Sequence, residues 1–335
     1  MARLTRTVWT LLALLGLAAC GAGSADAGAG GGRVELALVA YSTPQAAYEK
    51  IIKAFQATPA GRNVTFTQSY GASGEQSRAV ESGLRADIVA FSLEPDLTRL
   101  VKAGLVADDW NSDAAKGMIT DSVVVIATRK GNPKGIRTWD DLTKPGVEVI
   151  TPNPFVSGGA KWNVLAGYGA KSGRGSNRDA GVAYLSALFK NVPVQDDSAR
   201  KSLQTFAGGK GDAMLAYENE AIFAQENKQQ LDYVVPDATI LIENPVAVTK
   251  NSAHPTEAKA FRTFLHSAVA QKIYADNGYR PVVSGASTRQ FPAPPGLFTI
   301  ADLGGWTRVN KDFFDPQAGI MADIERKLGV STSKA

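Results

Sequence analysis

Histidine and cysteine are both scarce in this chain of 335 residues. His254 and His266 are the only histidines, and both occur late in the sequence. A Ser-His-Asp triad or a histidine metal centre would have to use these two side chains, and no G-x-S-x-G turn is present to hold a nucleophile. Carboxylates are scattered rather than paired at helical spacing. We therefore expect no enzymatic activity, no cofactor and no bound metal ion.

Nucleotide-binding fingerprints are also missing. The glycine-containing stretch "GASGEQS" (71–77) lacks the Gly-Lys-Ser/Thr ending of a P-loop. The stretch "GLRADIVAFS" (83–92) lacks a dinucleotide-binding pattern. These absences argue against a nucleotide ligand, and we expect no nucleic-acid partner.

A long hydrophobic run is absent, but a short one stands near the N-terminus. Residues 8–19, "VWTLLALLGLAA", fall short of the ~20 apolar residues that a membrane helix needs. Arg3 and Arg6 precede this run, and Cys20, the only cysteine, follows it. This order resembles a bacterial lipoprotein signal, so we expect a signal peptide over residues 1–19.

Cys20 would then be the lipidated first residue of the mature chain, and residues 20–33 would form a flexible, glycine-rich tether. A single cysteine excludes an intrachain disulfide, and a free buried thiol is the alternative role for Cys20. Loss of the two signal arginines lowers the formal net charge from +4 to about +2, so no strong electrostatic attraction follows. We expect the folded part outside the cytoplasm, anchored by lipid to the bacterial membrane, in the periplasm or at the cell surface.

Strand-like and helical segments alternate along the rest of the chain, which predicts an α/β fold of mostly parallel sheets covered by helices. The clearest helix is 44–57, where Ala47, Ile51, Ile52 and Phe55 share one face. Roughly 300 ordered residues favour two lobes over a single core. The expected strands are 34–42, 63–70, 86–92, 121–129, 147–152, 212–217 and 232–236.

Small residues follow several of these strands at the point where a helix begins. In "SGGA" (157–160), Ser157 can cap the helix, and two glycines leave its first backbone N–H groups accessible to a small anion. Similar starts occur at "STP" (42–44), at "GASGEQ" (71–76) with Ser73 as the cap, and at "DDSAR" (196–200). Because ligands of such folds bind beyond the carboxyl ends of the strands, we expect these starts to converge. Each start taken alone is also compatible with an ordinary loop.

A site built from neutral donors selects its ligand by protonation. Sulfate carries only hydrogen-bond acceptors, whereas hydrogen phosphate brings an O–H group that needs an acceptor of its own. An acidic residue in the site would therefore favour phosphate, and its absence favours sulfate; Asp196 and Asp197 could instead cap their own helix.

Several stretches closely resemble one known family, the periplasmic sulfate-binding proteins of ATP-driven (ABC) transporters. The most specific is "RKGNPKGIRTWDDLTKPGVEVITPNP" (129–154) followed by "SGGAKWN" (157–163). The others are "SYGASGEQ" (69–76), "ALFKNV" (187–192), "SAR" (198–200), "ENEA" (218–221), "YRP" (279–281), and "FTI" with "GGW" (298–306).

The resemblance implies the bilobed type II periplasmic-binding-protein fold, with two α/β lobes joined by crossing strands. The first lobe would hold residues 34–120 plus about 245–335, and the second lobe residues 121–244. The crossing strands would be 121–129 and 244–250.

The same resemblance implies a binding site without counter-charges. In that family the dianion is held by backbone N–H groups at helix starts, serine hydroxyls and one indole N–H. Carried over by motif, the ligand-binding residues here are Ser73, Ser157, Gly158, Gly159 and Ala199.

Two positions depart from the family pattern. The chain reads "AYENE" where the family usually has "AWENE", so Tyr217 replaces the indole donor, and it reads "AYS" where the family usually has "SYD", which places Ser42 at the first helix start. A tyrosine hydroxyl can accept as well as donate, so thiosulfate, molybdate and phosphate stay as alternatives to sulfate. The nearby aromatic residues Tyr41, Tyr70 and Trp162 are interpreted as packing.

Two other functions remain as alternatives. Paired tyrosines also occur in transferrin-like iron-binding modules, but these need histidine or carboxylate ligands nearby. An extracytoplasmic enzyme on the same fold is the second alternative. The favoured reading is a monomeric receptor whose lobes close on sulfate or thiosulfate, and whose partners are the membrane permease and ATPase of a transporter.

Overall fold

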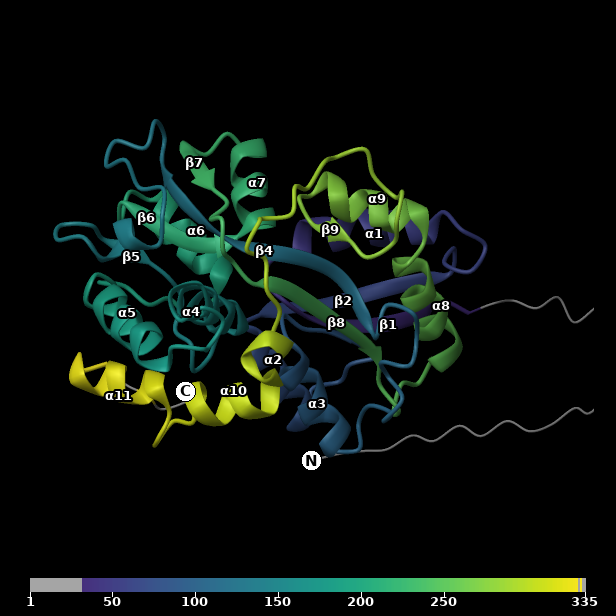
Figure 1. Ribbon diagram of the computed structural model, residues 1–335. Coiled ribbons are helices and arrows are strands. Elements are labelled where there is room, and N and C mark those ends of the chain that lie inside the picture. The colour runs from purple at the N-terminus through teal and green to yellow at the C-terminus, as the bar shows by residue number, and fades with distance from the viewer. Residues whose placement is uncertain (1–31, 331, 333–335) are drawn as a thin grey trace, which may run out of the picture. The chain divides into compact units, whose positions relative to one another are not determined.

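The computed structural model describes residues 32–330 and residue 332 (Figure 1). The expected signal peptide, Cys20 and most of the expected tether lie outside the described residues. The strands are β1 (Val34–Tyr41), β2 (Val64–Gly71), β3 (Ile88–Ala90), β4 (Met118–Arg129), β5 (Val149–Ile150), β6 (Ala213–Tyr217), β7 (Leu231–Val234), β8 (Leu241–Val248) and β9 (Arg280–Pro281).

Helices alternate with these strands, and the α/β class predicted from the sequence is confirmed. The helices are α1 (Gln45–Gln56), α2 (Ser73–Glu81), α3 (Glu94–Lys102), α4 (Gly158–Lys171), α5 (Arg178–Lys190), α6 (Ala199–Ala207), α7 (Glu218–Glu226), α8 (Pro255–Leu265), α9 (Ala268–Asp276), α10 (Gly305–Phe314) and α11 (Ile320–Lys327), with two short 3₁₀ turns, η1 (Asp140–Thr143) and η2 (Ala301–Leu303).

The strands follow the order β2-β1-β3-β8-β4-β6-β5, and β7 and β9 also pair with β4. Around β1 the pairing is parallel, with β2 on one side and β3 on the other. Successive side chains of a strand point to opposite faces. Leu36 and Leu38 accordingly pack with α1, α8 and α9, whereas Val39 packs with residues of α2 and α3.

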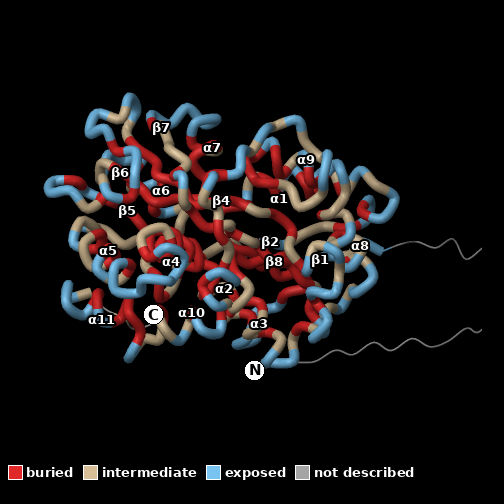
Figure 2. The backbone as a smooth tube through the Cα atoms, in the orientation of Figure 1, coloured by how far each residue is buried: buried red, intermediate tan, exposed pale blue. Residues whose placement is uncertain are grey.

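The other half of the sheet is built around β6, which pairs in parallel with β5 and antiparallel with β4. Leu215 and Tyr217 belong to the core that contains apolar residues of α4 and α5. Met214 and Ala216 belong to the opposite core, with residues of α6 and α7. Both halves are therefore helix–sheet–helix layers, and Figure 2 shows the buried strands running between exposed helix faces.

Two long strands join the halves. β4 and β8 pair antiparallel through Ser122 with Ile242 and Asp121 with Glu243, and the second part of β4 continues into pairing with β6 and β7. Residues 121–129 and 244–250, expected as crossing strands, thus lie largely in β4 and β8. The expectation of mostly parallel sheets is wrong, because every pairing of β4 is antiparallel.

The C-terminal helices pack on the second half of the sheet. Trp306 of α10 meets Trp162 of α4 edge-on at 4.8 Å between ring centroids, and Phe313 meets Tyr168 at 4.6 Å. Their apolar faces join the core that contains α4 and α5. Residues of about 298–327, expected in the first lobe, therefore pack against helices from residues 121–244. In the described part of the chain, no helix is both long enough and apolar enough to cross a membrane.

Candidate functional site

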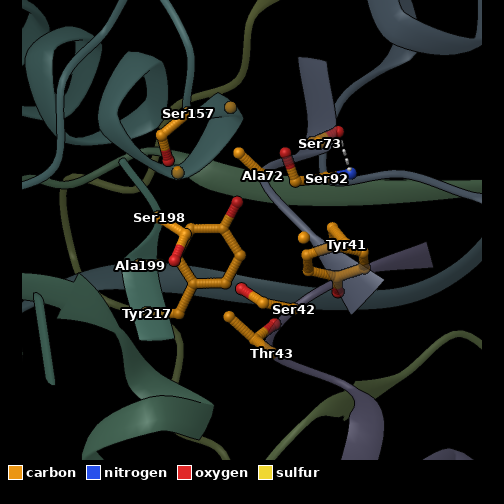
Figure 3. A pocket seen from close by; sticks show the side chains of 13 residues that line it. Tyr41, Ser42, Thr43, Ala72, Ser73, Ser92, Ser157, Ser198, Ala199 and Tyr217 are labelled. Carbon is orange, nitrogen blue, oxygen red and sulfur yellow. Dashed lines mark hydrogen bonds between the residues drawn. The ribbon is translucent and has the colours of Figure 1, made fainter. Parts of the chain in front are cut away.

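A small cavity of about 10 Å³ lies where several strands end (Figure 3). This volume is near the lower limit for holding one water molecule, so the walls are close together. All the ligand-binding residues expected from the sequence lie around it. The lining consists of Tyr41, Ser42, Thr43, Gly71, Ala72, Ser73, Ser92, Ser157, Gly158, Gly159, Ser198, Ala199 and Tyr217.

The lining residues come together because strand ends and helix starts meet there. β1 ends at Tyr41, β2 at Gly71 and β6 at Tyr217, while α2, α4 and α6 begin at Ser73, Gly158 and Ala199. The convergence of helix starts predicted from the sequence is thus present in the structure. The first N–H groups of each helix have no intrahelical acceptor, and the positive ends of the helix dipoles point to the same place.

Ser157 and Ser198 cap their helices, and the sequence predicted this role for Ser157. The Ser157 hydroxyl oxygen accepts from the N–H of Ala160 at 3.4 Å, and that of Ser198 accepts from the N–H of Lys201 at 3.3 Å. These caps leave the earlier N–H groups of α4 and α6, including that of Ala199, available to a ligand.

Gly158 has a second role that the sequence did not reveal. A Cβ atom on Gly158 would lie 1.9 Å from the Ser92 hydroxyl oxygen and 2.7 Å from Leu93 Cδ2. The missing side chain therefore lets the start of α4 pack against the end of β3. A Cβ on Gly159 would lie 3.2 Å from that of Ala199, which brings the starts of α4 and α6 close together.

Ser73 is not the cap of α2, which is a correction to the expectation. Ala72 holds the cap position, and the Ser73 hydroxyl donates to Asp96 at 2.6 Å and accepts from the N–H of Ser92 at 3.0 Å. Asp96 lies behind Ser73 and does not line the cavity. Burial raises the pKa of Asp96, against the opposing charge of Lys161. What Ser73 can offer a ligand is its backbone N–H at the start of the helix.

Tyr217 and Ser92 are nearly inaccessible, with 1% and 2% of their surface exposed. Neither hydroxyl has a hydrogen-bond partner among the described residues. Burial raises the pKa of Tyr217 well above its ordinary value, so its hydroxyl keeps its proton, and the nearby Ser92 hydroxyl acts in the opposite direction. Figure 3 shows the Tyr217 hydroxyl directed toward the side where Ser92 and Ser157 lie. Unpaired buried hydroxyls are costly, so a ligand that pairs them gains affinity.

Comparison with known proteins places this architecture in a family. The model of the bacterial extracellular solute-binding protein family matches residues 36–280. This chain belongs to that family. The predicted bilobed type II binding-protein fold is confirmed, because the solute-binding protein aligns with the sulfate-binding protein SubI from Mycobacterium tuberculosis at a TM-score of 0.82. That alignment has 47% identity and covers 84% of this chain and 100% of SubI.

Relatives of this solute-binding protein include sulfate-binding and thiosulfate-binding proteins. It is 43% identical over 311 residues to a sulfate-binding protein of Synechococcus elongatus, covering 89% of each chain. It is also 36% identical over 268 residues to a thiosulfate-binding protein of Escherichia coli, covering 76% of this chain and 79% of the relative.

None of the described residues that line the cavity of this solute-binding protein is charged. Arg200 follows Ala199, but its guanidinium pairs with both oxygens of Glu220 at 2.8 and 3.0 Å and donates to the carbonyl of Thr43 at 2.9 Å. Glu220 is 1% exposed, and burial raises its pKa against the opposing charge of Arg200. Its charge therefore compensates that of Arg200 outside the cavity. Among the described residues, no cluster of three or more metal-ligating side chains occurs.

Sequence reasoning missed part of the lining. Ser92 ends the expected strand 86–92, so the rule that ligands bind beyond strand ends could have identified it. Tyr41, interpreted as packing, lines the cavity, whereas Tyr70 and Trp162 do not. Thr43, Gly71, Ala72 and Ser198 also line it; they belong to the helix starts expected to converge but were not among the expected ligand-binding residues.

Proposed function

We propose that this protein is an extracytoplasmic receptor that captures sulfate in the cavity and delivers it to the permease of an ABC transporter. The observation that carries the proposal is a closely walled cavity lined by uncharged groups at converging helix starts. The sulfate-binding relatives support the same ligand.

Electrostatics explain how neutral groups can hold a dianion. Helix N-termini combine free N–H donors with favourable dipoles, and both act more strongly where water is excluded. Sulfate can accept from the N–H groups of Ser73, Gly158, Gly159 and Ala199 and from the Ser157 and Tyr217 hydroxyls. It has no proton of its own that must be accommodated.

The site residues come from both lobes in this proposal. We assign residues 34–120 and about 245–290 to the first lobe, which supplies Ser42 and Ser73. Residues 121–244 and about 298–330 form the second lobe, which supplies the helix starts of α4 and α6 and Tyr217. Hinge motion about β4 and β8 closes the lobes on the ligand. Trp162 then donates from the second lobe to the carbonyl of Ser92 at 2.7 Å.

The proposal includes a lipid anchor. The basic and apolar residues before Cys20 form the signal peptide, and Cys20 carries the lipid that holds the receptor at the membrane. Residues 20–33 give the folded part reach toward the permease and its ATPase. The receptor acts as a monomer, and no bond of the ligand is made or broken.

Thiosulfate is the second candidate ligand. The thiosulfate-binding relative supports it, and so does Tyr217, because a hydroxyl can rotate to suit an unequal set of ligand atoms.

Calorimetric titration of the mature protein tests the proposal. We expect sulfate to bind more tightly than thiosulfate, molybdate and phosphate at two pH values, with no turnover of any of them. Replacing Ser157 by alanine should weaken sulfate binding roughly tenfold, because a donor to the ligand is lost. Tighter binding of another anion would replace sulfate as the ligand, and turnover that Ser157→Ala abolishes would show an enzyme instead.

A further inference from the structure

Ser92 follows β3, and three hydrogen bonds fix its backbone while its side chain is unpaired. The backbone N–H donates to Ser73, and the carbonyl accepts from the Trp162 indole at 2.7 Å and from the Asn244 amide at 3.0 Å. The hydroxyl has no partner among the described residues and lies beside the start of α4. It can therefore rotate while its oxygen stays in place.

Most other hydroxyl oxygens of the cavity already accept or share a hydrogen bond. Ser157 and Ser198 accept from their own helices, and Ser73 accepts from the N–H of Ser92. Thr43 shares a hydrogen bond of 3.0 Å with Tyr279. Among the serine and threonine hydroxyls of the described lining, only that of Ser42 is also without one, and Ser42 is half-buried rather than enclosed.

Tyr41 also has an unpartnered hydroxyl, but it does not belong to this part of the cavity. In Figure 3 it points away from Tyr217. It lies near Thr43, Tyr279 and Thr120, which counteract the rise in its pKa caused by burial. A free acceptor enclosed beside the start of α4 is thus offered by Ser92 and Tyr217.

We propose that Ser92 and Tyr217 act as a hydroxyl pair that admits singly protonated oxyanions, of the hydrogen phosphate class, in addition to sulfate. This inference rests on the proposed function and extends the ligand class of the same cavity. It also assigns Ser92 as a ligand-contacting residue.

The pair can meet the hydrogen-bonding needs of both kinds of ligand. With sulfate, both hydroxyls donate to ligand oxygens. With hydrogen phosphate, the ligand O–H donates to Ser92, the Ser92 hydroxyl donates to Tyr217, and the Tyr217 hydroxyl donates to another ligand oxygen. Each hydrogen then has one acceptor, and no covalent bond changes. An indole in place of Tyr217 has only a donor, so Ser92 could no longer pass its hydrogen on and would be forced to donate to the ligand.

Titration of the mature protein and its variants with sulfate and with inorganic phosphate tests this pair. At slightly alkaline pH, where hydrogen phosphate predominates, the parent protein should bind both anions. Tyr217→Trp should keep sulfate binding and weaken phosphate binding roughly tenfold or more, because the ligand O–H loses its acceptor. Ser92→Ala should likewise lower phosphate affinity more than sulfate affinity. Ser42→Ala, which removes another hydroxyl of the lining, should lower both affinities by similar factors.

A double variant tests whether the Ser92 and Tyr217 hydroxyls act as one relay. For phosphate, Ser92→Ala combined with Tyr217→Phe should be little worse than either single change, because one break already interrupts the relay. Absence of sulfate binding to the parent protein would refute the proposed function itself. Sulfate binding without measurable phosphate binding, or an unchanged phosphate-to-sulfate ratio in Tyr217→Trp, would overturn only the hydroxyl pair.

Discussion

At the residue scale, Gly158 sets how closely the two halves of the molecule approach at the cavity. Because Gly158 has no side chain, the Ser92 hydroxyl and the Leu93 side chain can occupy the space where its Cβ would lie. The sequence predicts a glycine that exposes N–H groups to an anion, and the structure adds a packing reason for the same residue. Gly158 must pack against Ser92 and Leu93 and also keep its N–H accessible to an anion, so few other residues can replace it.

Gly158→Ala should therefore lower both stability and sulfate affinity. The added Cβ would lie 1.9 Å from the Ser92 hydroxyl oxygen, so either Ser92 or α4 must move. Overpacking of this kind destabilises a protein by about 1–3 kcal/mol. Thermal unfolding and calorimetry measure the two effects. Gly159→Ala, whose Cβ would have a nearest contact of 3.2 Å, should be milder in stability, and equal stability of Gly158→Ala and the parent would contradict the packing argument.

At the element scale, the crossing strands β4 and β8 place two like charges opposite each other. Asp121 pairs in register with Glu243 on β8 and with Arg280 on β9. Burial and the charge of Glu243 raise the pKa of Asp121 to about 7, while Arg280 acts in the opposite direction. A carboxyl group whose pKa is raised by folding binds its proton more tightly in the folded state. Its contribution therefore favours folding at low pH and is lost as pH rises toward and through 7.

Asp121→Asn should remove this part of the pH dependence. The variant should gain stability relative to the parent as pH rises from the ordinary aspartate pKa to above 7, and the difference should disappear in acid. Melting temperatures across this pH range give the comparison. Glu243→Gln should remove part of the same slope, because it takes away one cause of the shift. Parallel pH profiles for Asp121→Asn and the parent would exclude Asp121 as a titrating group in the hinge strands.

The elements also show how far sequence reasoning reaches. Local patterns suffice for helix starts such as Ser157 and Ala199, because caps and glycines act within a few residues. The partner of the Ser73 hydroxyl could not be predicted, since Asp96 is 23 residues away and reaches it only through packing of α2 on α3. The placement of α10 depended on the fit of Trp306 against Trp162, which periodicity alone does not encode.

At the scale of the whole molecule, closure joins groups that are distant in the chain. The Trp162 indole donates to the Ser92 carbonyl, and Arg200 donates to the Thr43 carbonyl, so both rims of the cavity carry contacts between the proposed lobes. In the proposed hinge motion, these contacts form as the lobes meet. Ligand binding and closure are then expected to be one coupled event.

Small-angle X-ray scattering should detect this coupling. Saturating sulfate should reduce the radius of gyration of the mature protein, because the closed form is selected. Trp162→Phe removes the bond to the Ser92 carbonyl and should weaken sulfate binding by roughly three- to tenfold. Trp306→Phe changes the same aromatic contact without touching that bond, and should leave sulfate affinity near that of the parent. Identical scattering with and without bound sulfate would argue against hinge closure.

The pairing of Arg200 with Glu220 bears on how sulfate binding depends on salt concentration. A site that attracted its ion with free positive charge would weaken as dissolved salt accumulates, because mobile ions screen such a field. Here the cation is matched by a buried carboxylate, and the cavity lining is uncharged. Short contacts among buried groups are screened far less, so sulfate affinity should change little between low and high salt concentration.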